Sequence, residues 1–536
     1  MNYDELGSCV ASETLSGSGG KMVSDFIRNV FPTSTHFASA GRLSRRQFIA
    51  AGSVLLAGQL LPGCDSRKRN FPPAEGATSA ERAVNAAKRF SGTILNIGWE
   101  TGDQAQDPLR FSGPLWEQLT GIRINVVEMG IPTNLFRRLM AEHHAGTGAI
   151  DCVMVAPAWM PSLLEAGALE PLDDYVNHYM VKADLDDFLP LYRSLGIWDG
   201  RRYGLVDDGD TLLLYYRRDL FEDAANQKDF AARFGRPLGD PRSYNWQQFI
   251  QAAGFFTDKF APGLYGIAPF NKWLRWGWFQ MLLRLNGGQF FDPATMKPRI
   301  DAEAGRRTMA DLAQMDRFMP PGAADTPDPS PLFASYLTGK SAMASFWPPL
   351  GRWAEAYGGE RSGGVPKSQV AGKTGYALLP GGHTELALGW LIAILANSKR
   401  KEAAYLFAQW LNSPEISLQR VTLPYSLRDP FRQSHFASPA YRGLWPSAPA
   451  YLETLKTAEA KAFLDLIIPG APEYEEAFYQ AANNIRLGTR VDDAMKQMAA
   501  TWEAITERYG RSHQRSAYER FLRRQSMTPA GTTVKT

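Results

Sequence analysis

Two kinds of hydrophobic pattern alternate along the chain after residue 92. Short, nearly continuous apolar runs predict buried strands over 93–99, 123–128 and 150–156. The stretches between them, near 115–120 and 133–144, have the apolar spacing of helices. Strands that alternate with helices and lack a polar face are typical of a parallel sheet covered on both sides. We therefore expect an α/β fold that binds its ligand beyond the carboxyl ends of the strands.

The rest of the chain continues this alternation and then becomes helical. The pattern predicts a hairpin over 198–205, strands over 212–216 and 386–396, a helix over 399–411, and further helices to about residue 509. It also predicts a turn and a strand within 339–349, and a strand and a turn within 375–382. Residues 511–536 are basic and then rich in threonine, which indicates a tail.

Residues 43–64 have the three parts of an export signal. Arg45 and Arg46 form a twin-arginine pattern, an uncharged and mainly apolar run follows over 49–61, and small residues lead to Cys64. The apolar run is too short for a membrane-spanning helix. We interpret 1–63 as a twin-arginine export signal with a long lead. The alternative is a buried helix that follows two arginines.

The end of the signal resembles a lipoprotein box, although Pro62 is an unusual residue there. Cys64 is therefore the candidate lipidation site, and 64–91 is the expected tether, ending in a short helix near 81–89. The protein is expected to be exported, periplasmic or at the cell surface, and anchored to the membrane if Cys64 is acylated.

Composition narrows the possible functions. The 536 residues are 44% hydrophobic and 21% charged, as in ordinary globular proteins. A net charge of +3 gives no sign of a nucleic-acid partner. Three cysteines are too few for a disulfide framework, and Cys152 is expected to be a small core residue. The 14 tryptophans suit carbohydrate contact, because sugar rings present apolar faces to flat aromatic rings.

Several segments together resemble a known family. They are Leu119-Thr120-Gly121-Ile122, Tyr203-Gly204-Leu205 followed by 214–221, Gly339-Lys340-Ser341-Ala342-Met343 with Trp347, Leu379-Pro380-Gly381-Gly382, and 402–411. In order and spacing they resemble extracellular solute-binding protein family 1, the maltodextrin-binding-like receptors of sugar ABC transporters. The resemblance implies a periplasmic-binding-protein type II fold, with two α/β lobes joined by a crossing-strand hinge. Lobe 1 would comprise 92–208 and 384–428, and lobe 2 would comprise 209–383 and 429–510.

Candidate ligand-binding residues come from the strand ends and from positions that match the family. Trp159 and Trp347 would stack on a sugar, and acids at the first crossing would accept hydrogen bonds from its hydroxyl groups. A C-terminal helix would add an aromatic ring. The set is Trp99, Glu100, Trp159, Asp208, Asp210, Trp273, Trp347, Trp390, Arg428 and Tyr474.

Structural alternatives exist for several of these positions. Trp390 lies in an apolar strand pattern, so it could instead be a core residue. The tryptophans of 273–278 could instead form the packing face of a helix. Asp207 could instead be a solvated turn residue. Asp210 could instead cap a helix or pair with an arginine.

The motifs favour binding over catalysis. A glycosidase needs two carboxylates across a sugar, and Asp208 with Glu100 or Asp103 is the pair to consider, but sequence does not fix its geometry. The acids of 207–210 form too short a loop for an EF-hand. We expect no enzyme activity, no cofactor and no metal.

The resulting hypothesis is a monomeric receptor that captures a sugar or oligosaccharide and delivers it to the permease of an ABC transporter. One alternative is a receptor for another organic solute, such as a polyamine or metal complex. Another is a sensing or scaffold lipoprotein without a transport role.

Overall fold

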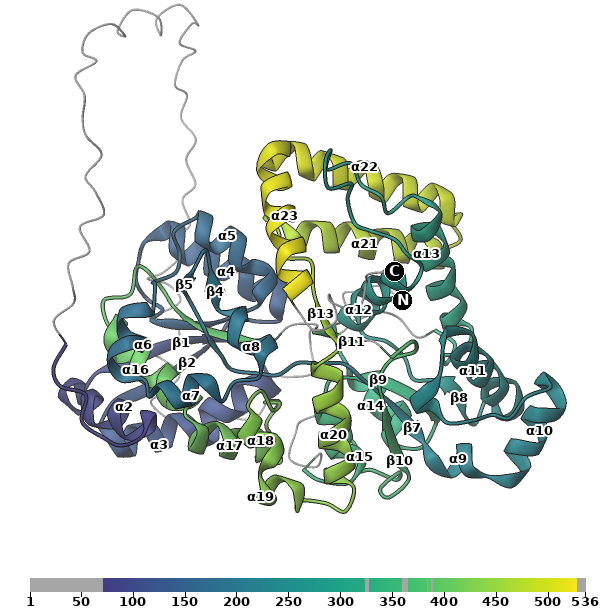
Figure 1. The fold of residues 1–536 in the computed structure, drawn as a ribbon, viewed down its shortest axis with the longest axis horizontal. Helices are drawn as coiled ribbons and strands as arrows, with labels where there is room; N and C mark the ends of the chain where they lie inside the picture. Colours follow the sequence, from purple (N-terminus) through teal and green to yellow (C-terminus); the bar gives the residue numbers. More distant parts are fainter. Residues whose placement is uncertain (1–70, 323–326, 359–364, 383, 387–388, 528–536) are drawn as a thin grey trace, which may run out of the picture. The chain divides into compact units, whose positions relative to one another are not determined.

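A five-stranded sheet forms the centre of the first lobe (Figure 1). Its order is β2 (Arg123–Glu128), β1 (Ile94–Trp99), β3 (Cys152–Val155), β12 (Leu391–Ile394) and β6 (Leu205–Val206). The three strands predicted first pair in parallel, whereas β12 runs antiparallel to β3 and β6, so the sheet is mixed. Helices α3 (Gly113–Thr120), α4 (Pro132–Ala145) and α16 (Lys401–Asn412) pack against it. Cys152 is buried in β3, as expected.

A four-stranded sheet forms the centre of the second lobe. Its order is β10 (Thr374–Ala377), β7 (Leu213–Arg217), β9 (Ser341–Phe346) and β8 (Tyr265–Ile267). Strand β7 is antiparallel to both neighbours, and β8 is parallel to β9. Both β7 and β9 are almost fully buried, which explains their continuous apolar pattern. The sheet is covered by α11 (Trp246–Phe260), α14 (Ser330–Leu337), α15 (Pro349–Ala354) and α20 (Ala448–Glu459).

Two chain segments cross between the sheets side by side. Residues 207–212 lead from β6 to β7, and a second connection, which includes Trp390, returns from β10 to β12. The N–H groups of Asp207 and Asp208 donate to the carbonyl oxygen of Trp390, at 2.8 and 3.3 Å. The predicted single strand over 386–396 is wrong, because β11 (Thr384–Leu386) and β12 are separate. Gly389 has φ 58° between them, a left-handed conformation that no strand continues through.

The remaining elements are mostly helices that pack around the two sheets. They are α2 (Ser79–Ala87), α5 (Met160–Glu165), α6 (Asp173–Tyr179), α7 (Lys182–Asp186), α8 (Pro190–Leu195), α9 (Arg218–Glu222), α10 (Ala224–Phe234), α12 (Lys272–Leu285), α13 (Glu303–Asp316), α17 (Pro414–Thr422), α18 (Gln433–Ala437), α19 (Pro439–Arg442), the predicted hairpin β4 (Ile197–Trp198) with β5 (Arg201–Arg202), and β13 (Ala462–Leu464) beside β11.

The computed structural model describes residues 71–322, 327–358, 365–382, 384–386 and 389–527. The predicted export signal and the candidate lipidation site Cys64 lie outside these residues. Within them, no helix has both the length and the apolar content that a membrane crossing requires.

The end of the expected tether belongs to the folded region. The predicted helix near 81–89 is α2, and its Ala83 and Ala87 are buried. The side chain of Gln409 in α16 donates to the carbonyl oxygen of Ser79 at 2.9 Å. Any tether therefore ends before Ser79.

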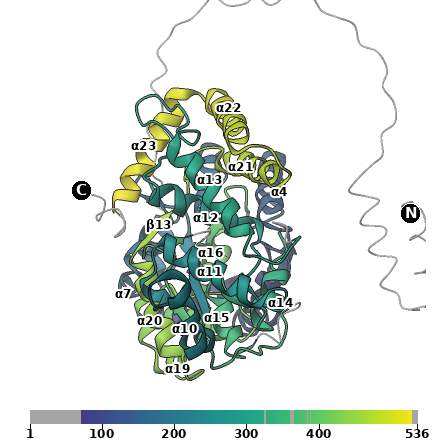
Figure 2. The ribbon, with the colours of Figure 1, turned by 90° about the vertical axis from the view of Figure 1, so that its right-hand side faces the viewer.

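The expected tail begins with a packed helix. Helices α21 (Ala471–Arg486), α22 (Val491–Tyr509) and α23 (Arg511–Met527) lie together in both views (Figures 1 and 2). In α23, Tyr518 and Phe521 are buried, and Gln525 accepts a hydrogen bond from the N–H of Leu464 at 2.9 Å. The prediction of a tail is thus wrong for 511–527. The high content of basic residues hid a narrow apolar face.

Deleting residues 511–536 should destabilise the protein. Full burial of one aromatic side chain contributes about 1.5–3 kcal/mol, so the loss of Tyr518 and Phe521 should lower the free energy of unfolding by at least about 3 kcal/mol. Urea unfolding followed by tryptophan fluorescence measures this. Deletion of 528–536 alone is the control and should change little; equal stability of both deletions would show that α23 is not part of the folded core.

Candidate ligand-binding site

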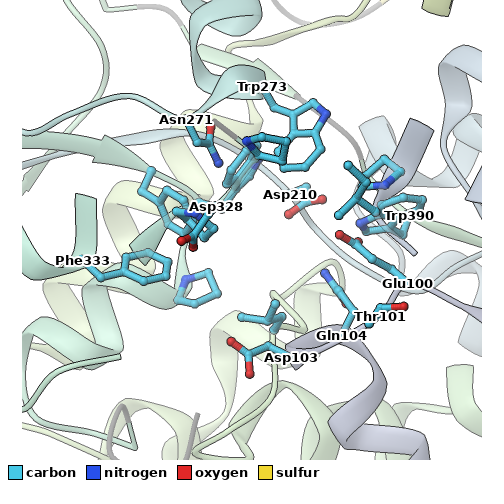
Figure 3. Close-up of a pocket in the computed structure, with 18 of the residues that line it drawn as sticks. Glu100, Thr101, Asp103, Gln104, Asp210, Asn271, Trp273, Asp328, Phe333 and Trp390 are labelled. Atoms are coloured by element: carbon cyan, nitrogen blue, oxygen red, sulfur yellow. The ribbon is translucent and has the colours of Figure 1, made fainter. Parts of the chain in front are cut away.

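A cavity of about 460 Å³ lies between residues of the two lobes and the crossing segments (Figure 3). The first lobe contributes Glu100, Thr101, Asp103, Gln104, Ile131 and Pro132. The crossings contribute Asp210 and Trp390, and the second lobe contributes, among others, Asn271, Trp273, Asp328, Phe333, Phe346, Trp347 and Trp353. Its size is within the range of pockets that bury small organic ligands.

Ends of strands and beginnings of helices place these side chains. Strand β1 ends at Trp99, so the chain turns at Glu100 into the cavity wall. In the second lobe, β9 ends at Phe346 and α15 begins at Pro349, which leaves Trp347 at the rim. Asn271 caps α12, where its side chain accepts from the N–H of Leu274 at 2.9 Å. The cap fixes the side chain of Asn271 beside that of Trp273 (Figure 3).

Half of the candidate residues are brought together at the cavity. Glu100, Asp210, Trp273, Trp347 and Trp390 line it. Figure 3 shows Glu100, Asp210 and Trp390 on one side of the space, with Asp328 and Phe333 on the other. The two alternatives for the tryptophans of 273–278 both apply, because Trp273 lines the cavity while Trp276 and Trp278 are core residues that donate to Asp465 and Ser345.

The other five candidates do not line the cavity. Trp99 is fully buried, with the Arg428 guanidinium 5.7 Å from its ring centre. Trp159 packs edge-on behind Trp390, with ring centres 5.5 Å apart. Asp208 and Arg428 are buried beneath the wall. They do not contact the cavity as predicted, but support the residues that line it.

Tyr474 lies in the packing of α21 on α22, where its hydroxyl is 3.0 Å from that of Thr506 and its ring contacts Trp502. The expectation that it faces the cleft is therefore wrong. Since Asp208 is buried, the carboxylate pair considered for a glycosidase is not assembled at the cavity.

Several lining residues were not predicted from the sequence. Gln104, Asn271, Phe333 and Trp353 are the clearest examples. Asn271 precedes an apolar helix and had a detectable capping signal. Gln104 and Phe333 lie in short helical segments whose pattern resembles that of many packed residues, so only the tertiary arrangement identifies them.

Buried ion pairs support the wall from behind. Arg420 lies 2.6 Å from both Asp107 and Asp207, and the Arg428 Nε atom lies 2.8 Å from Asp207. Burial alone would raise the pKa of Asp207, but the two guanidinium groups outweigh it and hold that pKa below its usual value. The alternative of a solvated turn at Asp207 is wrong, because the residue is fully buried.

The carboxyl groups nearer the cavity behave differently. Burial raises the pKa of Glu100 to about 8; Arg428 opposes the shift, while Asp208 and Asp103 add to it. Burial also raises the pKa of Asp210 well above its usual value, although Asp210 accepts a hydrogen bond from the N–H of Gly389. Burial thus favours the protonated form of both carboxyl groups, and a cation placed beside them would favour the ionised form.

Three carboxylates meet below the cavity. Asp208, Asp210 and Asp429 each place one oxygen within 4.8 Å of the others. Arg428 lies 3.5 Å from Asp208, and Arg352 lies 3.6 Å from Asp429. Arginine and proton sharing account for this cluster, and we assign it no metal.

This combination of a two-lobed fold and a cleft at the crossing segments is the architecture of periplasmic binding proteins. Residues 111–417 match the model of the bacterial extracellular solute-binding protein family, and the chain belongs to that family.

Individual relatives show where the chain stands within it. A probable amino-acid ABC transporter periplasmic-binding protein of Sinorhizobium fredii is 25% identical over 399 residues, covering 71% of this chain and 82% of that one. The erythritol/L-threitol-binding protein of Mycolicibacterium smegmatis is 24% identical, covering 78% and 87%. A solute-binding protein of Agrobacterium radiobacter in complex with ribitol superposes with a TM-score of 0.63 at 23% identity, covering 77% and 99%. The structural likeness confirms the type II periplasmic-binding-protein fold.

Replacing Arg420 by Met should destabilise the protein strongly. Asp107 and Asp207 would lose a buried counter-charge, which typically costs about 3–5 kcal/mol at neutral pH. Because the pKa of Asp207 is held low, its ion pairs stabilise the wild type above the unfolded pKa and lose that effect as pH falls through the folded pKa.

The difference between R420M and wild type, measured by urea unfolding, should therefore be constant near neutral pH and shrink as the pH falls below about 4, the ordinary pKa of an aspartate. Arg233→Met is the matched control, because its 2.6 Å pair with Asp258 is half-exposed and should contribute no more than about 1 kcal/mol. An R420M penalty that equals the control, or that grows in acid, would contradict the role of the buried pairs.

Proposed function

We propose that the protein is an exported receptor for a polyol, sugar or short oligosaccharide, which it releases to the membrane permease of an ABC transporter. The family is extracellular and binds solutes. The observation that carries the ligand class is the cavity itself, where carboxyl groups and indole rings from both lobes surround one space.

The lining chemistry suits a polyhydroxylated ligand. Carboxyl groups form strong hydrogen bonds with hydroxyls, and the faces of Trp273, Trp347 and Trp390 cover apolar C–H surfaces. The indole N–H groups of Trp347 and Trp353 have no hydrogen-bond partner among the described residues, although both side chains are more than nine-tenths buried. Both nitrogen atoms are enclosed by protein in this conformation, so only a movement of the surrounding side chains would bring these donors to acceptor oxygens of a ligand.

Relatives support the same class. The Mycolicibacterium protein is named for erythritol and L-threitol, and the Agrobacterium structure contains ribitol. Enclosure between lobes further implies hinge closure around the ligand. Acylation of Cys64 and a tether before Ser79 are part of the proposal and rest on the sequence, as do the lobe boundaries.

A panel of polyols, sugars and short oligosaccharides tests the function. A ligand at 100 times its dissociation constant should stabilise the folded protein by about 2.7 kcal/mol. Differential scanning fluorimetry, followed by calorimetry on each hit, measures this. Absence of a shift with every member of the panel would refute the proposed ligand class.

Replacing Trp347 by Ala should weaken the binding of the best ligand by about tenfold or more, because the cavity loses an aromatic ring. Trp198→Ala is the control, since Trp198 is half-buried on the β4–β5 hairpin, away from the cavity lining. Calorimetric affinities of folded variants decide the outcome. Unchanged affinity in W347A would remove this wall from the site.

A further inference from the structure

We propose that the preferred ligand carries a positive charge, as an amino sugar or an aminated polyol does. This inference rests on the proposed receptor function and narrows its ligand. It comes from the charges of the cavity wall and of the layer beneath it.

The wall is acidic. Glu100, Asp103, Asp210 and Asp328 line the cavity, and the described lining residues include no lysine, arginine or histidine. Glu100 and Asp210 are the two important residues, because the charge of Glu100 acts on Asp210 and the charge of Asp208 acts on both. In Figure 3 their carboxylates face the interior of the cavity.

The buried arginines provide little positive charge to balance Glu100 and Asp210. Arg428 is the cation that acts on both Glu100 and Asp210, but it is 1% exposed and already faces Asp207, Asp208 and Gln104. Together, the wall and the buried layer beneath it hold three guanidinium groups and six carboxyl groups: Arg352, Arg420 and Arg428 against Glu100, Asp107, Asp207, Asp208, Asp210 and Asp429.

A ligand ammonium group would supply the missing counter-charge. It would pair with Glu100 and Asp210 through charge-assisted hydrogen bonds. The indole faces of Trp273, Trp347 and Trp390 add cation–π attraction, which is strongest where water is excluded. The polar side chains of Thr101 and Gln104 also line the cavity and would face the hydroxyl groups of the same molecule. One end of the ligand would thus be cationic and the rest hydroxylated.

Binding should then release protons. In the ligand-free protein burial raises the pKa of Glu100 to about 8 and that of Asp210 well above its usual value. Arg428, Asp208 and Asp103 act on Glu100, whereas Asp208, Glu100 and Arg428 act on Asp210. Asp210 in turn acts on Asp429 and Tyr192. A cation favours the ionised carboxylates, so its affinity should rise from pH 6 to pH 8, whereas a neutral polyol should show no such rise.

Matched ligands provide the experiment. Calorimetry on the full chain compares mannitol with 1-amino-1-deoxymannitol, and glucose with glucosamine and N-acetylglucosamine, in two buffers of different ionisation enthalpy. We expect the amine of at least one set to bind about tenfold or more tightly than its neutral counterparts, equivalent to about 1.4 kcal/mol, with proton release to the buffer.

Two charge-removing variants locate the effect. Glu100→Gln and Asp210→Asn should each reduce the ratio of amine affinity to neutral-polyol affinity, measured within the same variant, to about threefold or less. Glu117→Gln removes the same charge from an exposed position on α3 and should keep the full preference. Thermal melts of each variant confirm folding.

The outcomes separate the two proposals. Equal or tighter binding of the neutral ligands would overturn the cationic preference and leave the receptor function intact. A preference that survives in both E100Q and D210N would overturn it as well. Failure of every polyol, sugar and amine to bind would overturn the proposed ligand class itself.

Discussion

Three arginine side chains are buried where the chain passes between the lobes, and each is surrounded by oxygen atoms. Arg420 joins Asp107 of the first lobe to Asp207 of the first crossing, and Arg428 pairs with Asp207 and Asp208. Arg352 of α15 in the second lobe donates to the carbonyl oxygens of Val421 and Ser426 at 2.9 and 2.8 Å. Buried charges are tolerated only with such partners, so this junction constrains every segment that enters it.

This junction determines which side chains line the cavity and how their charges are balanced. The hydrogen bonds of Asp207 and Asp208 to the Trp390 carbonyl hold the two crossings together, and this places Asp210 and Trp390 on the same wall. The arginines below are already engaged, so the carboxyl groups that face the space are left with little compensation. The way the lobes are connected thus places carboxyl groups with little counter-charge at the ligand site. Hinge motion would have to keep these buried pairs intact.

Much of the fold could be predicted from sequence because its strands are buried on both faces. The continuous apolar runs at β1, β2 and β3 are specific signals, and their boundaries came within a few residues. The tail over 511–527 was mispredicted because Tyr518 and Phe521 are spaced among arginines, and their burial depends on residues far away in the chain. The break between β11 and β12 depends on a glycine conformation that the apolar pattern conceals.

The sequence by itself determined the family, the two-lobed fold, and the types of residue that meet at the crossings. Acids before a buried strand and tryptophans at strand ends are local features, and local features can be seen in a sequence. Only the tertiary structure decided which of them face the cavity. Trp273 and Trp276 differ by three positions in one helix, and Asp208 and Asp210 by two in one crossing, yet one of each pair lines the cavity and the other does not. That choice depends on what packs against each side chain from distant parts of the chain, which no local pattern records.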